Sequence, residues 1–195
     1  MGQRLLVING HPDPRPERLC AALANAYGEG AASTGRLVRR LDLGSMEFPI
    51  IRSEAEFEDG AVPPSIAEAQ DAIRWADHLL IVHPLWLGGP PALLKGFLEQ
   101  AFRYGFATPR PGEGSPLGGL LKGRTARVVV TMGMPALAYR WMFGAFGARA
   151  LERGVLWLSG FRGLRRTLLG SVGAASAQTR GGWLERMRRL GARGD

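Results

Sequence analysis

Five short apolar segments alternate with segments of helical periodicity along this chain, and this alternation restricts the fold more than any other feature. The apolar segments are residues 5–8, 37–41, 79–82, 126–131 and 164–169. Each intervening helix must return the chain to the same end of the sheet, so the strands pair in parallel through right-handed crossovers. We therefore predict an α/β fold with a doubly wound, five-stranded parallel sheet, forming one domain over residues 1–195.

The strand order follows from the positions of the arginines. Segments 37–41 and 164–169 contain arginines, which suits edge strands, whereas the other three segments are apolar enough to be buried on both faces. This distribution predicts the order 2-1-3-4-5, which is typical of flavodoxin-like folds. In such sheets, ligands bind at the carboxyl ends of the central strands.

Apolar residues recur at spacings of three and four between the strands and predict the helices. The predicted helix faces are Leu19, Ala22, Leu23, Ala26 and Tyr27; Ile66, Ala69, Ile73 and Ala76; Leu93, Leu94, Phe97, Leu98, Ala101 and Phe102; and Trp183, Leu184, Met187 and Leu190. Ser65 and Glu68 have the spacing of a capping box at the start of the second helix. A further helix is expected from Ala136 to before Gly154, residues 104–123 read as a lid or binding loop, and residues 42–64 give no assignment.

Three loops are expected to meet at the carboxyl ends of the central strands, namely residues 9–18, 84–91 and 131–139. The first opens a helix whose amino-terminal amides suit a phosphate, and His11, Arg15 and Arg18 supply hydrogen-bond donors there. The second, Pro84-Leu85-Trp86-Leu87-Gly88-Gly89, offers backbone amides and an aromatic wall to a flat ligand.

In the third loop, Gly133 permits close approach of the backbone, and the amides of Gly133 and Met134 suit a ring oxygen. The hydroxyl of Tyr139 suits a ligand that delocalises charge. Each of these residues also has a structural interpretation, because His11 and Gly133 fit simple turns and Trp86 and Tyr139 fit core packing. Cys20 and His83 are interpreted as core residues.

Composition and missing motifs narrow the possible functions. The chain lacks G-x-G-x-x-G, G-x-x-x-x-G-K-[ST], G-x-S-x-G and H-E-x-x-H, which disfavours a Rossmann dinucleotide site, nucleoside triphosphate hydrolysis, a serine hydrolase and a zinc protease. One cysteine and no cysteine cluster predict no disulfide, no metal site and a cytoplasmic location, and no segment is long and apolar enough for a membrane span.

The net charge of +8 arises entirely after residue 139, where 11 basic and 3 acidic residues lie. Such a patch attracts anions, including dinucleotide phosphates, or nucleic acid. Since the aromatic residues there have helix-core spacing, we expect no nucleic-acid partner.

The motifs together resemble the flavodoxin-like NAD(P)H:quinone oxidoreductases, the family of DT-diaphorase and its bacterial relatives. The resemblance rests on LVINGHPDP at residues 6–14, on Ala76-Asp77 leading to PLW at 84–86 and PALLKG at 91–96, and on TMGM at 131–134 before Tyr139. It covers nearly the whole chain, and the middle motif is the most specific.

The resemblance implies FMN or FAD bound without a covalent link and NAD(P)H as electron donor. The flavin phosphate would lie at His11 and Arg18, the ring against Pro84, Leu85, Trp86 and Leu87, and its pyrimidine end at Thr131, Gly133, Met134 and Tyr139. Gly133 and Tyr139 would act on charge that develops on the reduced ring. NAD(P)H and a quinone-like substrate would then use the same pocket in turn.

Two positions depart from the family pattern. Relatives usually have serine and asparagine in the phosphate loop where this chain has Pro16 and Arg18, so the phosphate contacts must differ. The mammalian enzymes have a histidine six residues after the tyrosine, where this chain has Ala145, so a tyrosine–histidine proton relay is absent.

The resemblance also implies a homodimer in which a neighbour's loop completes the pocket, here Tyr104, Phe106 and the residues after them. The leading hypothesis is a flavin-dependent oxidoreductase. The alternative is a flavodoxin-like regulatory subunit, such as an ancillary protein of a potassium efflux system, in which cofactor occupancy controls a partner.

Overall fold

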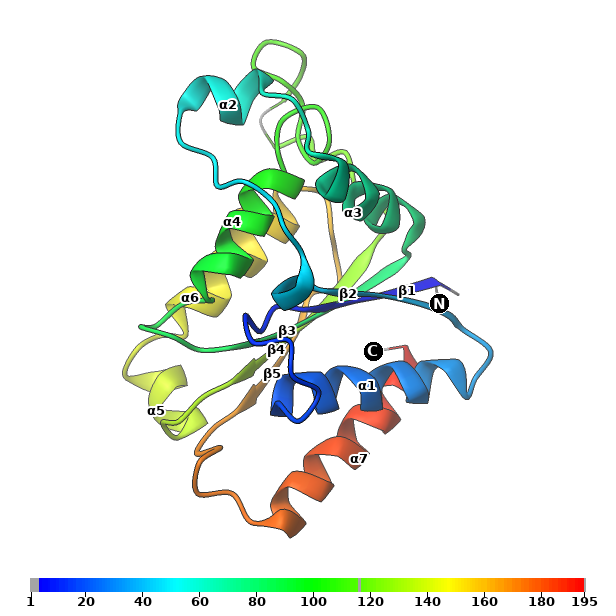
Figure 1. The fold of residues 1–195 in the computed structure, drawn as a ribbon, viewed down its shortest axis with the longest axis vertical. Helices are drawn as coiled ribbons and strands as arrows, with labels where there is room; N and C mark the ends of the chain where they lie inside the picture. The colour runs from blue at the N-terminus through cyan, green and yellow to red at the C-terminus, as the bar shows by residue number, and fades with distance from the viewer. Residues whose placement is uncertain (1–3, 116, 195) are drawn as a thin grey trace.

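The computed structural model describes residues 4–115 and 117–194. Their five strands form one parallel sheet in the order β2-β1-β3-β4-β5 (Figure 1). The strands are β1 (Arg4–Asn9), β2 (Leu37–Asp42), β3 (His78–Pro84), β4 (Thr125–Thr131) and β5 (Arg165–Leu169). The predicted fold class and strand order are confirmed. The two strands with adjacent arginines, β2 and β5, are the edges, and β3 at the centre is buried along its whole length.

Helices cover both faces of the sheet (Figure 1). One face packs against α1 (Leu19–Ala32) and α7 (Ala177–Arg193), and the other against α3 (Pro64–Trp75), α4 (Ala92–Ala101) and the π-helix η2 (Ala150–Trp157). Successive side chains of β3 alternate between these two cores, since Leu79 and Ile81 join the second and Leu80 and Val82 the first. A period of two is what a strand buried on both sides requires.

Glycines bring α1 and α7 into backbone contact. A Cβ at Gly30 would lie 2.0 Å from the carbonyl oxygen of Arg188, and one at Gly191 would lie 2.0 Å from that of Tyr27. These two positions therefore have room only for hydrogen, and the close packing fixes α7 against the helix that begins at the candidate site.

The start of one helix differs from the prediction, and one helix cap was not predicted. Ser65 does not cap α3, because its hydroxyl donates to the carbonyl of Glu47 and Pro63 precedes the helix. Ser53 instead caps α2 (Glu54–Asp59), where its oxygen accepts from the amide of Glu56, 3.2 Å away. The short helix η1 (Leu43–Ser45) and α2 both lie in the segment that gave no assignment.

The prediction of a single helix from Ala136 to before Gly154 is also wrong. The chain forms α5 (Ala136–Trp141), breaks at Gly144 and Ala145, then continues as α6 (Phe146–Arg149) and η2. The break arises because both residues have positive φ, 56° and 50°, which no right-handed helix accommodates. Among the described residues, no helix is long and apolar enough to cross a membrane.

The loop after α4 is packed more closely than predicted. The side chain of Phe106 is 6% exposed and lies edge-on to Phe102, so it belongs to this chain's own core and does not project toward a neighbour. Tyr104 is half-buried against Phe57. The expectation that Phe106 reaches a partner's pocket is therefore wrong.

Candidate functional site

The three predicted loops meet at the carboxyl ends of β1, β3 and β4. The amide of Gly10 donates to the carbonyl of Val82 (2.7 Å), and that of Leu85 donates to the carbonyl of Thr131 (2.7 Å). These bonds extend the sheet ladder one step beyond the strands. The loops are therefore held in fixed positions relative to one another where they leave the sheet.

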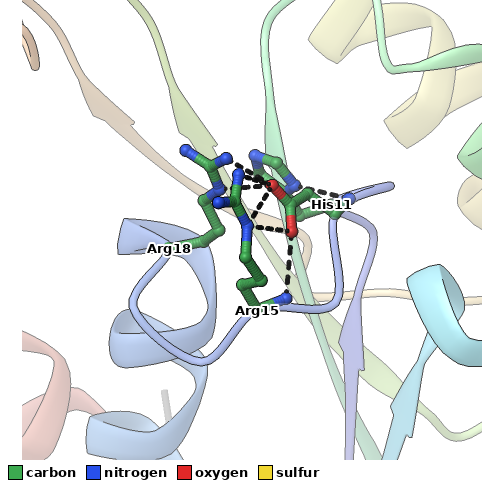
Figure 2. Close-up of polar contacts among 4 residues, drawn as sticks. His11, Arg15 and Arg18 are labelled. Atoms are coloured by element: carbon green, nitrogen blue, oxygen red, sulfur yellow. Dashed lines mark hydrogen bonds and ion pairs between the residues drawn. The ribbon is translucent and has the colours of Figure 1, made fainter.

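Asp13 organises the first loop. Its carboxylate accepts from Nε of Arg15 (3.0 Å) and Nε of Arg18 (2.6 Å), and Figure 2 shows both guanidinium groups turned to this one acceptor. The amide of Arg15 also donates to it (3.1 Å), and this bond together with the guanidinium group of Arg15 holds the pKa of Asp13 below its usual value. The cluster of two arginines and one carboxylate keeps a net positive charge.

His11 lies on the same loop with one ring nitrogen engaged. Its Nδ1 accepts a hydrogen bond from the amide of Asp13 (3.0 Å), and partial burial lowers the pKa of the ring, opposed by Asp13. A neutral ring that accepts at Nδ1 carries its proton on Nε2. Nε2 of His11 is therefore a hydrogen-bond donor suited to a phosphate oxygen.

Helix α1 begins at Leu19, directly after Arg18 of the Asp13–Arg15–Arg18 cluster. No side chain caps it, and its first turn contains no acidic residue. Helix amides that lack a side-chain partner attract anions. Gly44 of η1 packs closely against the backbone of this loop, because a Cβ there would lie 2.6 Å from the carbonyl oxygen of Pro12.

The second loop folds into a tight hairpin. Trp86 and Gly89 exchange two backbone hydrogen bonds of 2.9 and 3.0 Å, and the central residues Leu87 and Gly88 have φ of 48° and 83°. Positive φ at both positions is the geometry of a type I′ turn, which strains a leucine. The turn leaves Leu87 fully exposed and Trp86 half-exposed, with its ring edge-on to His11 at 6.1 Å between centroids.

Tyr139 forms a hydrogen bond to the backbone of this hairpin. Its side chain is buried, its hydroxyl donates to the carbonyl of Gly88 (3.4 Å), and it accepts from the amide of Ala148 (3.2 Å). A Cβ at Gly147 would lie 2.1 Å from the same carbonyl oxygen. In this arrangement Tyr139 contacts Gly88 of the hairpin. Its hydroxyl would have to break its hydrogen bond to Gly88 or to Ala148 before it could bind a ligand directly.

The third loop presents mostly main chain. The hydroxyl of Thr131 lies 3.4 Å from Sγ of Cys20 in α1, so its side chain is buried on the α1 side of the sheet. Gly133 is exposed, with nothing within 4 Å of where a Cβ would be, and the carbonyl of Met134 accepts from the amide of Ser171 (2.9 Å). Pro84 is buried at the end of β3, and Leu85 is half-buried in the core beside α4.

Cys20 and His83 lie beneath the site in the core. Burial raises the pKa of the Cys20 thiol to about 11, and it lowers the pKa of His83 to about 4. Neither side chain is exposed. The placement of both residues agrees with the prediction.

Sequence reasoning did not single out Asp13 and Gly147 as site residues. The signal for Asp13 was its place between two prolines and next to three basic side chains. Gly147 had no signal, because its importance depends on the approach of a carbonyl 59 residues earlier in the chain.

The residues present fit a flavin. Exposed Trp86 and Leu87 with the open backbone of Gly133 suit an apolar ring with a polar edge, and the uncapped helix with His11 suits a phosphate. A hollow of about 450 Å³ lies elsewhere, between α4, η2 and residues 104–114, and none of its lining residues belongs to the three loops. We place the candidate site at the loops because the anion-binding groups gather there. Within residues 4–115 and 117–194, no group of three or more His, Cys, Asp or Glu could hold a metal ion.

Comparison with known proteins gives consistent matches. A family model described as flavodoxin-like fold matches residues 3–190. An uncharacterized NAD(P)H oxidoreductase of Haemophilus influenzae is 33% identical over 138 residues, covering 69% of this chain and 67% of the relative. A ribosyldihydronicotinamide dehydrogenase [quinone] of Pongo abelii is 24% identical over 217 residues, covering 97% and 92%.

Among solved structures, an FMN-dependent NADH-azoreductase of Bacillus anthracis in complex with FMN superimposes with a TM-score of 0.76 over 98% of each chain. Its identity to this chain is 16%, so the likeness concerns the fold.

Proposed function

The chain belongs to the family with the flavodoxin-like fold and is an oxidoreductase of the NAD(P)H dehydrogenase (quinone) type, and we propose that it transfers a hydride from NAD(P)H, by way of non-covalently bound FMN or FAD, to a quinone or similar acceptor. The observation that carries the proposal is the exposed Trp86–Gly89 hairpin beside the uncapped start of α1. An aromatic ledge and an anion site next to each other match the two ends of a flavin nucleotide.

The phosphate end is bound by the first loop. Nε2 of His11 and the first amides of α1 donate to the phosphate, and Arg18 shares its charge between the phosphate and Asp13. This arrangement replaces the serine and asparagine contacts that are usual in relatives.

The ring end is bound by the second and third loops. An apolar wall that excludes water is formed by Pro84, Leu85, Trp86 and Leu87. The polar edge is formed by Thr131, the last residue of β4, and by the amides of Gly133 and Met134. A flavin held there supplies hydride-accepting chemistry. Donors fixed before reaction lower the energy of negative charge that develops beside them, so we propose Gly133 as the catalytic residue at this edge.

We propose that Tyr139 is a positioning residue. It acts through Gly88, whose carbonyl it holds, and thereby keeps Trp86 and Leu87 in place. With Ala145 at the position of the family's histidine, no imidazole accompanies this hydroxyl, so its contribution is geometric.

A homodimer in the cytoplasm is part of the same proposal. Support for the dimer comes from the resemblance to the quinone oxidoreductases. Support for the cytoplasm comes from the single cysteine, Cys20, whose thiol is free and buried.

The test is to denature purified protein, identify the released flavin by chromatography, and follow NADPH and NADH oxidation with menadione. We expect FMN or FAD at close to one per chain and turnover that depends on the quinone. Trp86→Ala should weaken flavin binding by about fivefold, because an aromatic contact contributes about 1 kcal/mol, whereas Trp141→Ala, at an exposed tryptophan outside the three loops, should bind flavin normally.

Protein that neither releases nor binds a flavin would overturn the proposal. Flavin binding with negligible turnover, combined with activation of a potassium transporter, would replace the enzymatic function with the regulatory one.

A further inference from the structure

An exposed apolar patch lies on α5 and the start of α6. We call it the α5–α6 patch and define it as Leu137, Trp141, Met142, Phe143 and Phe146, whose exposure ranges from 49% to 78%. Five large apolar side chains within ten residues are unusual on a surface that faces only water. Patches of this kind mark interaction sites.

The break between α5 and α6 exposes these side chains. Leu137 and Trp141 are four residues apart and share one face of α5. The left-handed residues Gly144 and Ala145 then turn the chain, and a Cβ at Gly144 would lie 3.1 Å from the ring of Phe146. A continuous helix would have placed these residues on different faces.

A basic hollow of about 440 Å³ lies next to the patch. Leu137 lines it, and so do four arginines from α5, α6, β5 and α7, namely Arg140, Arg149, Arg166 and Arg186. The hollow and the patch therefore share Leu137 and both short helices. The guanidinium group of Arg140 also lies over the ring of Trp141, 5.5 Å from its centroid.

Three of these arginines have no acidic partner among the described residues. Arg166 is paired with Glu152, its Nε lying 2.6 Å from Oε1, whereas no ion pair involves Arg140, Arg149 or Arg186. Glu152 is the one carboxylate between residues 134 and 157. The positive charge around the hollow is therefore not neutralised by the protein.

We propose that the α5–α6 patch and the basic hollow dock this protein on a bilayer that contains anionic phospholipid. Lipid phosphates fit the hollow, since guanidinium groups bind phosphate oxygens through paired hydrogen bonds. Tryptophan and phenylalanine fit the boundary between headgroups and acyl chains, and arginines beside them add attraction to an anionic surface.

Charge favours a lipid surface over a second copy of the chain. A symmetric contact through the patch would bring Arg140 and Arg149 of both copies together, and the one nearby carboxylate, Glu152, is already paired. Like charges facing each other destabilise an interface. An anionic membrane supplies the missing counter-charge without such repulsion.

The patch lies beside the candidate site. Gly147 follows Phe146, and its backbone meets Gly88 of the hairpin so closely that a Cβ would lie 2.1 Å from the Gly88 carbonyl oxygen. A docked molecule would thus present the Trp86–Gly89 hairpin near the lipid surface. The docking itself requires neither flavin nor turnover, so its test is independent of the proposed function.

The experiment is flotation of the purified full chain with vesicles of phosphatidylcholine alone or with 30% phosphatidylglycerol. We expect binding to the anionic vesicles only, weakening as salt rises. Each arginine should contribute about fivefold, so the triple variant Arg140→Gln, Arg149→Gln, Arg186→Gln should bind about a hundredfold more weakly. Arg52→Gln with Arg193→Gln, at exposed arginines that line no part of the hollow, should lose far less.

The apolar part has its own variants. Trp141→Ala with Phe146→Ala should abolish flotation, while the similarly exposed Ile50→Ala should not. Tryptophan emission should shift to the blue on anionic vesicles, and Trp141→Phe should retain binding but lose most of the shift. Circular dichroism checks that each variant is folded.

Three outcomes would overturn the proposal: equal binding to both kinds of vesicle, no binding to either, and normal flotation of the arginine and aromatic variants. Light scattering covers the remaining interpretation. If Trp141→Ala with Phe146→Ala converts a dimer to a monomer, the patch is a contact between copies and the lipid assignment is wrong.

Discussion

At the scale of single residues, His83 has a hydrogen bond at one ring nitrogen and none at the other. Its Nδ1 donates to the carbonyl of Pro84 (2.9 Å), and Nε2 is buried with no hydrogen-bond partner among the described residues. A carbonyl only accepts, so the ring is neutral with its proton on Nδ1. Protonating Nε2 would place a charge in the core, which is why burial lowers the pKa to about 4.

This lowered pKa makes stability depend on pH. Below pH 6.5 the unfolded chain binds a proton at this ring, while the folded protein resists until about pH 4. The stabilisation is therefore complete above pH 6.5 and is lost as pH falls through this window, by about 3 kcal/mol. Urea unfolding at pH 7, 5 and 4 should show a smaller fall for His83→Asn, which keeps the donor to Pro84 and does not titrate. Equal falls for both proteins would contradict the predicted titration.

Leu87 illustrates strain retained at a candidate site. Its φ of 48° costs a leucine about 1 kcal/mol, whereas asparagine tolerates this conformation and Asn-Gly is the preferred type I′ pair. Leu87→Asn should therefore stabilise the protein by about 1 kcal/mol in thermal unfolding and weaken flavin binding through the lost apolar contact. Ile50→Asn, which is also exposed and has no positive φ, should give no such gain. A destabilised Leu87→Asn protein would show that the side chain contributes to stability in the free protein.

The contact between α1 and α7 is the clearest case at the scale of the elements. Gly191→Ala places a methyl group 2.0 Å from the carbonyl oxygen of Tyr27, so the helices must separate. We expect a loss of about 3 kcal/mol in urea unfolding, at the upper end for overpacking.

The same helix offers a matched control for this substitution. A Cβ at Gly181 would have no heavy atom within 4 Å, so Gly181→Ala should instead stabilise α7 by about 1 kcal/mol through helix propensity. If both alanines have the same effect, the helices are not in backbone contact.

For the molecule as a whole, the features that could be predicted from sequence are those set by local pattern. Residues 79–82 are a continuous apolar run and residues 126–131 are apolar except for Arg127 and Thr131, which fits buried strands, while the adjacent pairs of arginines in β2 and β5 indicate the edges. The three loops of the site follow directly, because parallel strands bring their carboxyl ends to one edge.

Features set by distant contacts could not be predicted. Residues 54–61 are held by Arg103, whose Nη1 donates to the carbonyls of Glu56 (2.8 Å) and Gly60 (3.0 Å), about 45 residues earlier in the chain. Ser65 has the spacing of a capping residue, but its hydroxyl bonds to Glu47 because the fold brings that carbonyl close. The helix predicted from residue 136 fails at Gly144 and Ala145, where the turn lets Gly147 approach the hairpin.

Hydrogen exchange of the flavin-free protein, measured with and without added FMN or FAD, tests the central claim most directly. The account predicts protection at residues 9–18, 84–91 and 131–139, where the anion-binding groups and the exposed hairpin lie. Protection confined instead to residues 102–114 and 154–159, around the hollow of about 450 Å³ between α4 and η2, would contradict it.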